Sequence, residues 1–196
     1  MNPRDELASN LEAVQARIAA ACADAGRAPD DVRLVVVTKF FPASDVRLLA
    51  DLGVTDVGEN RHQEAEAKAA ECADLGLTWH FIGGLQSNKA AAVAAYADVI
   101  ESVDRAKLLA PLAKGAHQRS HEADVLLQVS LDPPDREGRA GADPDALGDL
   151  ARAVEDAGML RLRGLMAVAP VGVQRVVLLG ATADLDDRDP AVRQLG

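Results

Sequence analysis

Aromatic residues are scarce in this chain: Phe, Trp and Tyr together make up only 3% of its 196 residues. A core with so few rings has to be built from aliphatic side chains. Apolar residues still reach 48% of the sequence, which is ordinary for a soluble globular protein. A chain of this length supports one sizeable core and is too short for two comfortable domains. We therefore expect a core packed mainly with Ala, Val and Leu.

Positive charge is also in short supply. The chain has 21 Lys and Arg residues against 31 Asp and Glu, and its formal net charge is −10. A polyanion would be repelled by such a protein, which argues against nucleic acid as the main partner. A small phosphorylated molecule stays possible, because a few backbone amides and one cation can hold a single phosphate.

Signals for export and for membrane insertion are lacking as well. The first residues carry acids and no apolar stretch of a secretory signal, and no apolar run approaches the length of a membrane span. The only two cysteines, Cys22 and Cys72, lie in Ala-rich stretches of helical pattern, which suits reduced, packed thiols better than a disulfide or metal site. We expect a soluble cytoplasmic protein without a metal centre, and its oligomeric state stays open.

Short apolar runs alternate with longer stretches of helical period. Strands are predicted at 34–38, 54–57, 79–82, 98–102, 125–129 and 162–168. Strands separated by helices of ten to fifteen residues indicate an α/β fold with a parallel sheet. A dinucleotide-binding open sheet loses support, because no G-x-G-x-x-G follows the first strand. Periodicity alone does not decide between an open sheet and a closed barrel.

Several residues mark where helices begin and end. The first helix should end at Gly26, Ser44 or Asp45 should open the second, and Ser87 should cap an Ala-rich helix. Asp143 followed by proline predicts a capped helix start. The stretch 131–143 is expected to be a mobile loop between a strand and a helix.

Lys39 is the sharpest candidate for chemistry. It ends the first predicted strand and is followed by Phe40 and Phe41. A lysine amine near apolar surroundings loses some preference for its charged form and becomes a competent imine former. The alternative interpretation is a lysine that extends to solvent from the end of a strand.

Glu59 and Asn60 follow the second predicted strand. The Asn60 amide offers a neutral donor and acceptor to a ligand, and a helix N-cap is an equally good interpretation. Glu59 is expected to pair with Arg61 or with Arg47. Both strand ends lie at the carboxyl edge of the sheet, where α/β folds place their chemistry.

His80 lies in the third predicted strand, between two large apolar residues. A single histidine in that setting is more often a satisfied core residue than an acid or base. Gly83 and Gly84 permit a close backbone approach, and Ser87 to Lys89 could present amides and a cation to an anion.

Four segments together resemble a known family: 34–39 (LVVVTK), 56–60 (DVGEN), 79–89 (WHFIGGLQSNK) and 162–166 (LRGLM). They occur in the order and with the spacing of the pyridoxal phosphate homeostasis proteins, the YggS/PROSC family related to the N-terminal domain of alanine racemase. The resemblance implies an α/β, TIM-barrel-like domain that binds pyridoxal 5′-phosphate. It also implies an internal aldimine on Lys39, with Asn60 and a loop carrying Met166 near the cofactor.

The resemblance stops after Pro170. Family members continue into a serine- and glycine-rich loop that holds the cofactor phosphate, and this chain runs differently over 171–196. We therefore expect a cofactor-binding barrel domain over 1–170, incomplete at its C-terminal end, and a divergent tail over 171–196 from truncation or a shifted reading frame. Weaker cofactor binding than in complete homologues would follow.

The family is described as a cofactor carrier or regulator, so a catalytic role is not expected. One alternative is a lysine-dependent enzyme, racemase-like or aldolase-like, with His80 as its acid or base. The other alternative is a truncated fragment without function.

Overall fold

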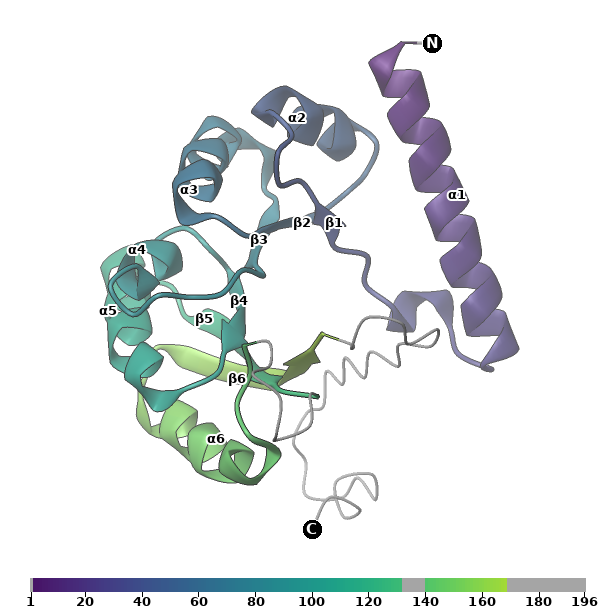
Figure 1. Cartoon of the computed structure of the whole chain (residues 1–196). Coiled ribbons are helices and arrows are strands. Elements are labelled where there is room, and N and C mark those ends of the chain that lie inside the picture. The colour runs from purple at the N-terminus through teal and green to yellow at the C-terminus, as the bar shows by residue number, and fades with distance from the viewer. Residues whose placement is uncertain (1, 132–139, 169–196) are drawn as a thin grey trace. The chain divides into compact units, whose positions relative to one another are not determined.

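A computed structural model describes residues 2–131 and 140–168 of the chain. It divides into two compact units, residues 1–82 and 83–196, and each is described by itself (Figure 1). The predicted tail over 171–196 and most of the predicted loop over 131–143 lie outside the described residues.

The first unit alternates helices with three parallel strands. Its helices are α1 (Pro3–Asp24), α2 (Ala43–Asp51) and α3 (His62–Glu71), with short 3-10 turns at Pro29–Asp31 and Ala73–Leu75. Its strands are β1 (Val36–Val37), β2 (Asp56–Glu59) and β3 (Thr78–Phe81). β1 pairs with β2 and β2 with β3, each in parallel. In Figure 1, α2 and α3 lie on the same side of these strands.

Local signals explain both ends of α1. The Asn2 side chain accepts a hydrogen bond from the Arg4 amide, and Pro3 occupies the first helical turn, where its missing N–H is not needed. Gly26 follows the helix with φ of +66°, a conformation that glycine adopts without steric cost. The predicted end of this helix is confirmed.

The start of α2 differs from the prediction. Pro42, not Ser44 or Asp45, is the N-cap residue, and no side chain caps this helix. Pro42 has φ of −72° and an extended ψ, so its ring sets the turn into the helix two residues early. Ser44 then lies inside the first turn.

β1 is also shorter and more open than a strand buried on both faces. Its ladder covers Val36 and Val37, and one further bond runs from the Thr38 amide to the Gly58 carbonyl at 3.0 Å. Thr38 is buried, and Val37, on the opposite face, is 42% exposed. The prediction of two buried faces is wrong, because the face that carries Val37 is partly open within the described residues.

The second unit repeats the same alternation. Its helices are α4 (Ala90–Ala94), α5 (Leu109–Arg119) and α6 (Leu147–Asp156), with 3-10 turns at Ala106–Leu108 and Pro144–Ala146. Its strands are β4 (Val99–Val103), β5 (Ala123–Val129) and β6 (Leu160–Ala167), paired in parallel in that order. Asp143 accepts a hydrogen bond from the Asp145 amide, which confirms the predicted cap.

Aliphatic side chains fill the interior, as the scarcity of aromatics predicts. Ile100, Leu108, Leu112 and Leu127 are among the largest fully buried residues. Cys22 and Cys72 are buried, free thiols, as expected. Within residues 2–131 and 140–168, no helix is both long and apolar enough to cross a membrane.

Candidate functional site

Lys39 and Asn60 lie just past the carboxyl ends of two neighbouring strands of the first unit, β1 and β2. Val37 pairs with Gly58 in the β1–β2 register, and side chains two residues further along each strand point to the same face. Lys39 and Asn60 each follow that pair by two residues, and Lys39 lies in a turn that the Phe41 amide closes on the Thr38 carbonyl at 3.1 Å. The bond from the Thr38 amide to the Gly58 carbonyl holds this part of the register.

Gly58 leaves the level beneath these two residues without a side chain. A Cβ atom at this position would lie 3.3 Å from Val35 Cγ1 and 3.5 Å from side-chain carbons of Val37 and Ile82. Aliphatic side chains therefore lie close around the glycine, on the strand that leads to Asn60. A flat apolar group can lie on such a surface.

Asn60 is not a helix cap. The N-cap residue of α3 is Arg61, and no side chain caps that helix. The Asn60 Oδ1 atom is buried and has no hydrogen-bond partner. Buried polar atoms are normally paired, so an acceptor left open here fits a ligand that brings a donor. The structure thus decides against the N-cap interpretation of Asn60.

Lys39 itself is half-buried, and its Nζ lies 6.0 Å from the centroid of the Phe40 ring. Phe40 and Phe41 are 68% and 58% exposed, so they do not enclose the amine as expected from the sequence. The reason is local: Phe40 has φ of +71°, and this left-handed residue turns its ring outward. The same ring lies 5.2 Å from the Arg61 guanidinium carbon.

A buried ion pair lies on the other face of the same strand ends. Lys68 Nζ is 2.5 Å from Glu59 Oε1 and donates a second bond to the Thr38 carbonyl at 2.9 Å. The Thr38 hydroxyl also donates to Glu59 Oε1, at 2.7 Å. These bonds join α3 to Glu59 at the end of β2 and to Thr38, the last residue before Lys39.

This cluster is not predicted from the sequence, which pointed to Arg61 or Arg47 as the partner of Glu59. Both assignments are wrong: Arg61 pairs with Glu64, and Arg47 pairs with Asp74. A signal was present, because Lys68 follows Ala65 by three residues and precedes Cys72 by four. That spacing places a lysine on the buried face of α3, where a charge requires a partner.

His80 is buried and satisfied, as predicted for a core histidine. Its Nε2 lies 3.0 Å from Asp56 Oδ1, and Arg33 approaches the same oxygen at 3.5 Å. In the β2–β3 register His80 is level with Gly58, and Asp56 lies two residues nearer the amino ends of the strands. The imidazole therefore bonds in the direction that leads away from Lys39.

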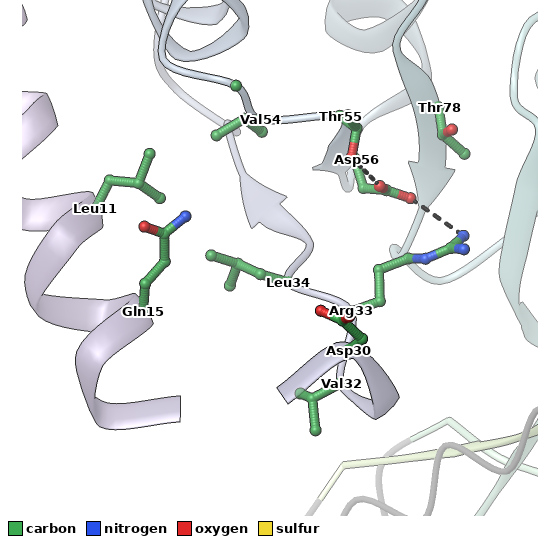
Figure 2. Close-up of a pocket in the computed structure, with 11 residues that line it drawn as sticks. Leu11, Gln15, Asp30, Val32, Arg33, Leu34, Val54, Thr55, Asp56 and Thr78 are labelled. Carbon is green, nitrogen blue, oxygen red and sulfur yellow. Dashed lines mark hydrogen bonds and ion pairs between the residues drawn. The ribbon is translucent and has the colours of Figure 1, made fainter. Parts of the chain in front are cut away.

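A pocket of about 500 Å³ opens at these amino ends (Figure 2). Leu11 and Gln15 of α1 line one side, and Arg33 and Asp56 line the other, with the ion pair between them drawn as a dashed line. Parallel α/β folds bind ligands beyond the carboxyl ends of their strands. This pocket therefore lies at the end opposite to Lys39.

The remaining candidates belong to the second unit. Met166 is half-buried and lies inside β6, paired with Gln128, so the expected loop position of Met166 is wrong. Ser87 does not cap α4, whose N-cap is Lys89. The role of Met166 beside a cofactor stays a prediction.

Comparison with known proteins assigns the class to which this fold and site belong. The family model of the alanine racemase N-terminal domain matches residues 7–190. This domain is an α/β, TIM-barrel-like fold, in agreement with the parallel strands and helices of both units. The matched range runs past residue 170, and a domain boundary at that point stays a prediction.

Individual relatives narrow the assignment. The pyridoxal phosphate homeostasis protein of Pseudomonas aeruginosa is 41% identical over 179 residues, which are 91% of this chain and 77% of the relative. Its namesake in Escherichia coli K12 is 36% identical and covers 84% and 70% of the two chains. The solved structure of PipY from Synechococcus elongatus, with PLP bound, is 38% identical, with a TM-score of 0.67 over 80% of this chain and 73% of PipY. The chain belongs to the family of pyridoxal phosphate homeostasis proteins.

Proposed function

We propose that this chain binds pyridoxal 5′-phosphate in intracellular cofactor homeostasis, and that Lys39 is the covalent attachment point. One observation carries the assignment to this site. The Lys39 amine and the unpartnered Asn60 Oδ1 belong to residues that follow the carboxyl ends of two paired strands. The names of the relatives and the PLP-bound PipY structure support the choice of ligand.

The cofactor supplies an aldehyde whose carbon can condense with a primary amine. The neutral Lys39 amine provides the nitrogen: a carbon–nitrogen double bond forms, and the aldehyde oxygen leaves as water with the two amine protons. Asn60 Oδ1 is free to accept a hydrogen bond from a donor on the ring. The aliphatic surface over Gly58 suits one flat face of a ring.

A carrier role is favoured over lysine-dependent catalysis. The enzyme alternative requires an acid or base facing Lys39, and His80 was its candidate. The His80 imidazole is engaged with Asp56, which lies nearer the amino ends of the strands, in the direction that leads away from Lys39. A cytoplasmic location is part of the proposal, and the two free thiols support it.

Borohydride reduction of the protein mixed with pyridoxal phosphate tests the assignment. Reduction fixes the linkage, and peptide mass spectrometry locates the added mass. We expect a visible absorbance band that reduction removes, and a label on Lys39. Lys39→Ala should lose both, and Lys107→Ala, at an exposed lysine of the second unit, should keep both. Unchanged labelling of Lys39→Ala at equal folded content would overturn the assignment.

A further inference from the structure

Two cations approach one aromatic ring beside the attachment point. The Phe40 centroid lies 6.0 Å from Lys39 Nζ and 5.2 Å from the Arg61 guanidinium carbon. Both distances fall within the range of cation–π attraction. Lys39, Phe40, Asn60 and Arg61 are called the Lys39 corner from here on.

The backbone holds this arrangement in place. Phe40 has φ of +71°, which is costly for a residue with a Cβ atom, so the turn aims its ring in one direction. That ring is 68% exposed, and burial of the ring therefore does not account for its position. Two cations lie near this exposed ring.

The Arg61 guanidinium has more N–H donors than its ion pair uses. Within residues 2–131 and 140–168, its ion pair joins NH1 to Glu64 Oε1 at 3.2 Å, with the two side chains 59% and 40% exposed. An exposed pair of this kind is weak, and a guanidinium carries five N–H donors. A ligand anion can therefore bind Arg61 beside Glu64 or in its place at little cost.

The negative charge of the whole chain contrasts with the two cations at the Lys39 corner. With a formal net charge of −10, the protein as a whole repels anions. Two cations next to an open acceptor, the Asn60 Oδ1, make the Lys39 corner an exception. An anionic ligand that also brings a hydrogen-bond donor would match all three groups.

We propose that Arg61 binds the anionic group of the ligand that reacts at Lys39. The inference rests on the proposed function and adds a specificity residue to it. Two sources carry the required chemistry. One is the phosphate of the cofactor itself, and the other is the carboxylate of an amino acid whose amine displaces Lys39.

Two labelling measurements distinguish the sources. The first compares reductive labelling of Lys39 by pyridoxal phosphate and by pyridoxal, which lacks the phosphate. The second starts from cofactor-loaded protein and compares release by glycine and by glycinamide, which lacks the carboxylate. The variant is Arg61→Gln. The control is Arg152→Gln, which changes net charge equally and also breaks an exposed pair three residues apart on a helix, with Asp149.

If the phosphate is bound, Arg61→Gln raises the half-saturating concentration of pyridoxal phosphate about tenfold and leaves pyridoxal unchanged. If the carboxylate is bound, the variant loses the preference for glycine over glycinamide. Glu64→Gln, which removes the competing carboxylate, should shift the same quantity the opposite way.

Equal behaviour of Arg61→Gln and Arg152→Gln in both measurements overturns the inference and leaves Lys39 labelling intact. Absence of any label on wild-type Lys39 overturns the proposed function, and this inference with it. The two failures are therefore distinguishable in one data set.

Discussion

Lys68 and Glu59 form a buried ion pair, with Nζ and Oε1 2.5 Å apart, on the face of the strands opposite to Lys39. Lys68 also holds the carbonyl of Thr38, the residue before Lys39. Glu59 Oε2 is buried without a partner, so the carboxylate depends on the contacts made by Oε1. This charge pair thereby holds the end of β1.

Breaking this pair should destabilise the protein strongly. Either Lys68→Met or Glu59→Gln leaves one side of the pair uncompensated in the interior, and we expect a loss of about 3–5 kcal/mol in the free energy of unfolding. Urea unfolding monitored by circular dichroism measures it. A loss below about 1 kcal/mol would show that water reaches the pair.

The double variant provides the internal control for that experiment. In Glu59→Leu/Lys68→Met no charge remains buried, so its loss should be clearly smaller than the sum of the two single losses. Thr38→Val removes only the hydroxyl bond to Glu59 and should cost about 1 kcal/mol. Additive losses would contradict a coupled pair.

Asn60→Ala should affect ligand binding and leave stability nearly unchanged. Oδ1 has no partner to lose, and Asn60 does not cap α3, so we expect a change within about 0.5 kcal/mol. Loss of a helix cap would instead cost about 1 kcal/mol. Reductive labelling of Lys39 by pyridoxal phosphate should weaken at the same time. Unchanged labelling would remove Asn60 from the site.

Phe40→Gly should move stability and binding in opposite directions. Glycine relieves the strain at φ of +71°, and the ring that is lost is mostly exposed, so we expect a gain of about 0.5–1 kcal/mol. Phe41 is similarly exposed and does not have a positive φ, so Phe41→Gly should lose stability. Thermal unfolding of the two variants compares them directly. Because Phe40→Gly removes the ring beside Arg61, it should weaken cofactor labelling.

The alternation of strands and helices was predictable because buried parallel strands appear as continuous apolar runs. The residues 125–129 and 162–168 fall on β5 and β6 with small shifts at their ends. The adjacency of Lys39 and Asn60 was predictable for a related reason. The carboxyl ends of neighbouring parallel strands meet at one edge, so polar residues that end two such strands come together.

The partners of charged residues were not predictable in the same way. Assigning Glu59 to Lys68 requires knowledge that the inner face of α3 packs against the end of β2, which is tertiary information. The outward turn at Phe40 was missed because a phenylalanine gives no local signal for a positive φ. Lys68 on the apolar face of α3 was the one available signal.

Stability above about pH 9 should depend on the buried thiol of Cys72. Burial raises the pKa of its thiol above the ordinary value of 9.0, and Arg47 opposes the shift to a smaller extent. The unfolded chain then ionises first, so this contribution is fully present below the unfolded pKa and is lost as pH rises through the folded pKa. Urea unfolding between about pH 7 and about pH 10.5, under reducing conditions, measures it.

Cys72→Ser and Cys72→Ala carry no ionisable thiol at this position and should be less stable than wild type near neutral pH. The difference between wild type and each variant should therefore narrow above about pH 9, by at most about 1.4 kcal/mol per pH unit. All other titrating groups are shared by the three proteins, so their effects cancel in that difference. Stability curves that stay parallel across the range would mean that the Cys72 thiol ionises equally well in the folded and unfolded chains. Water would then reach this thiol, which lies 3.8 Å from the Ala43 carbonyl of α2.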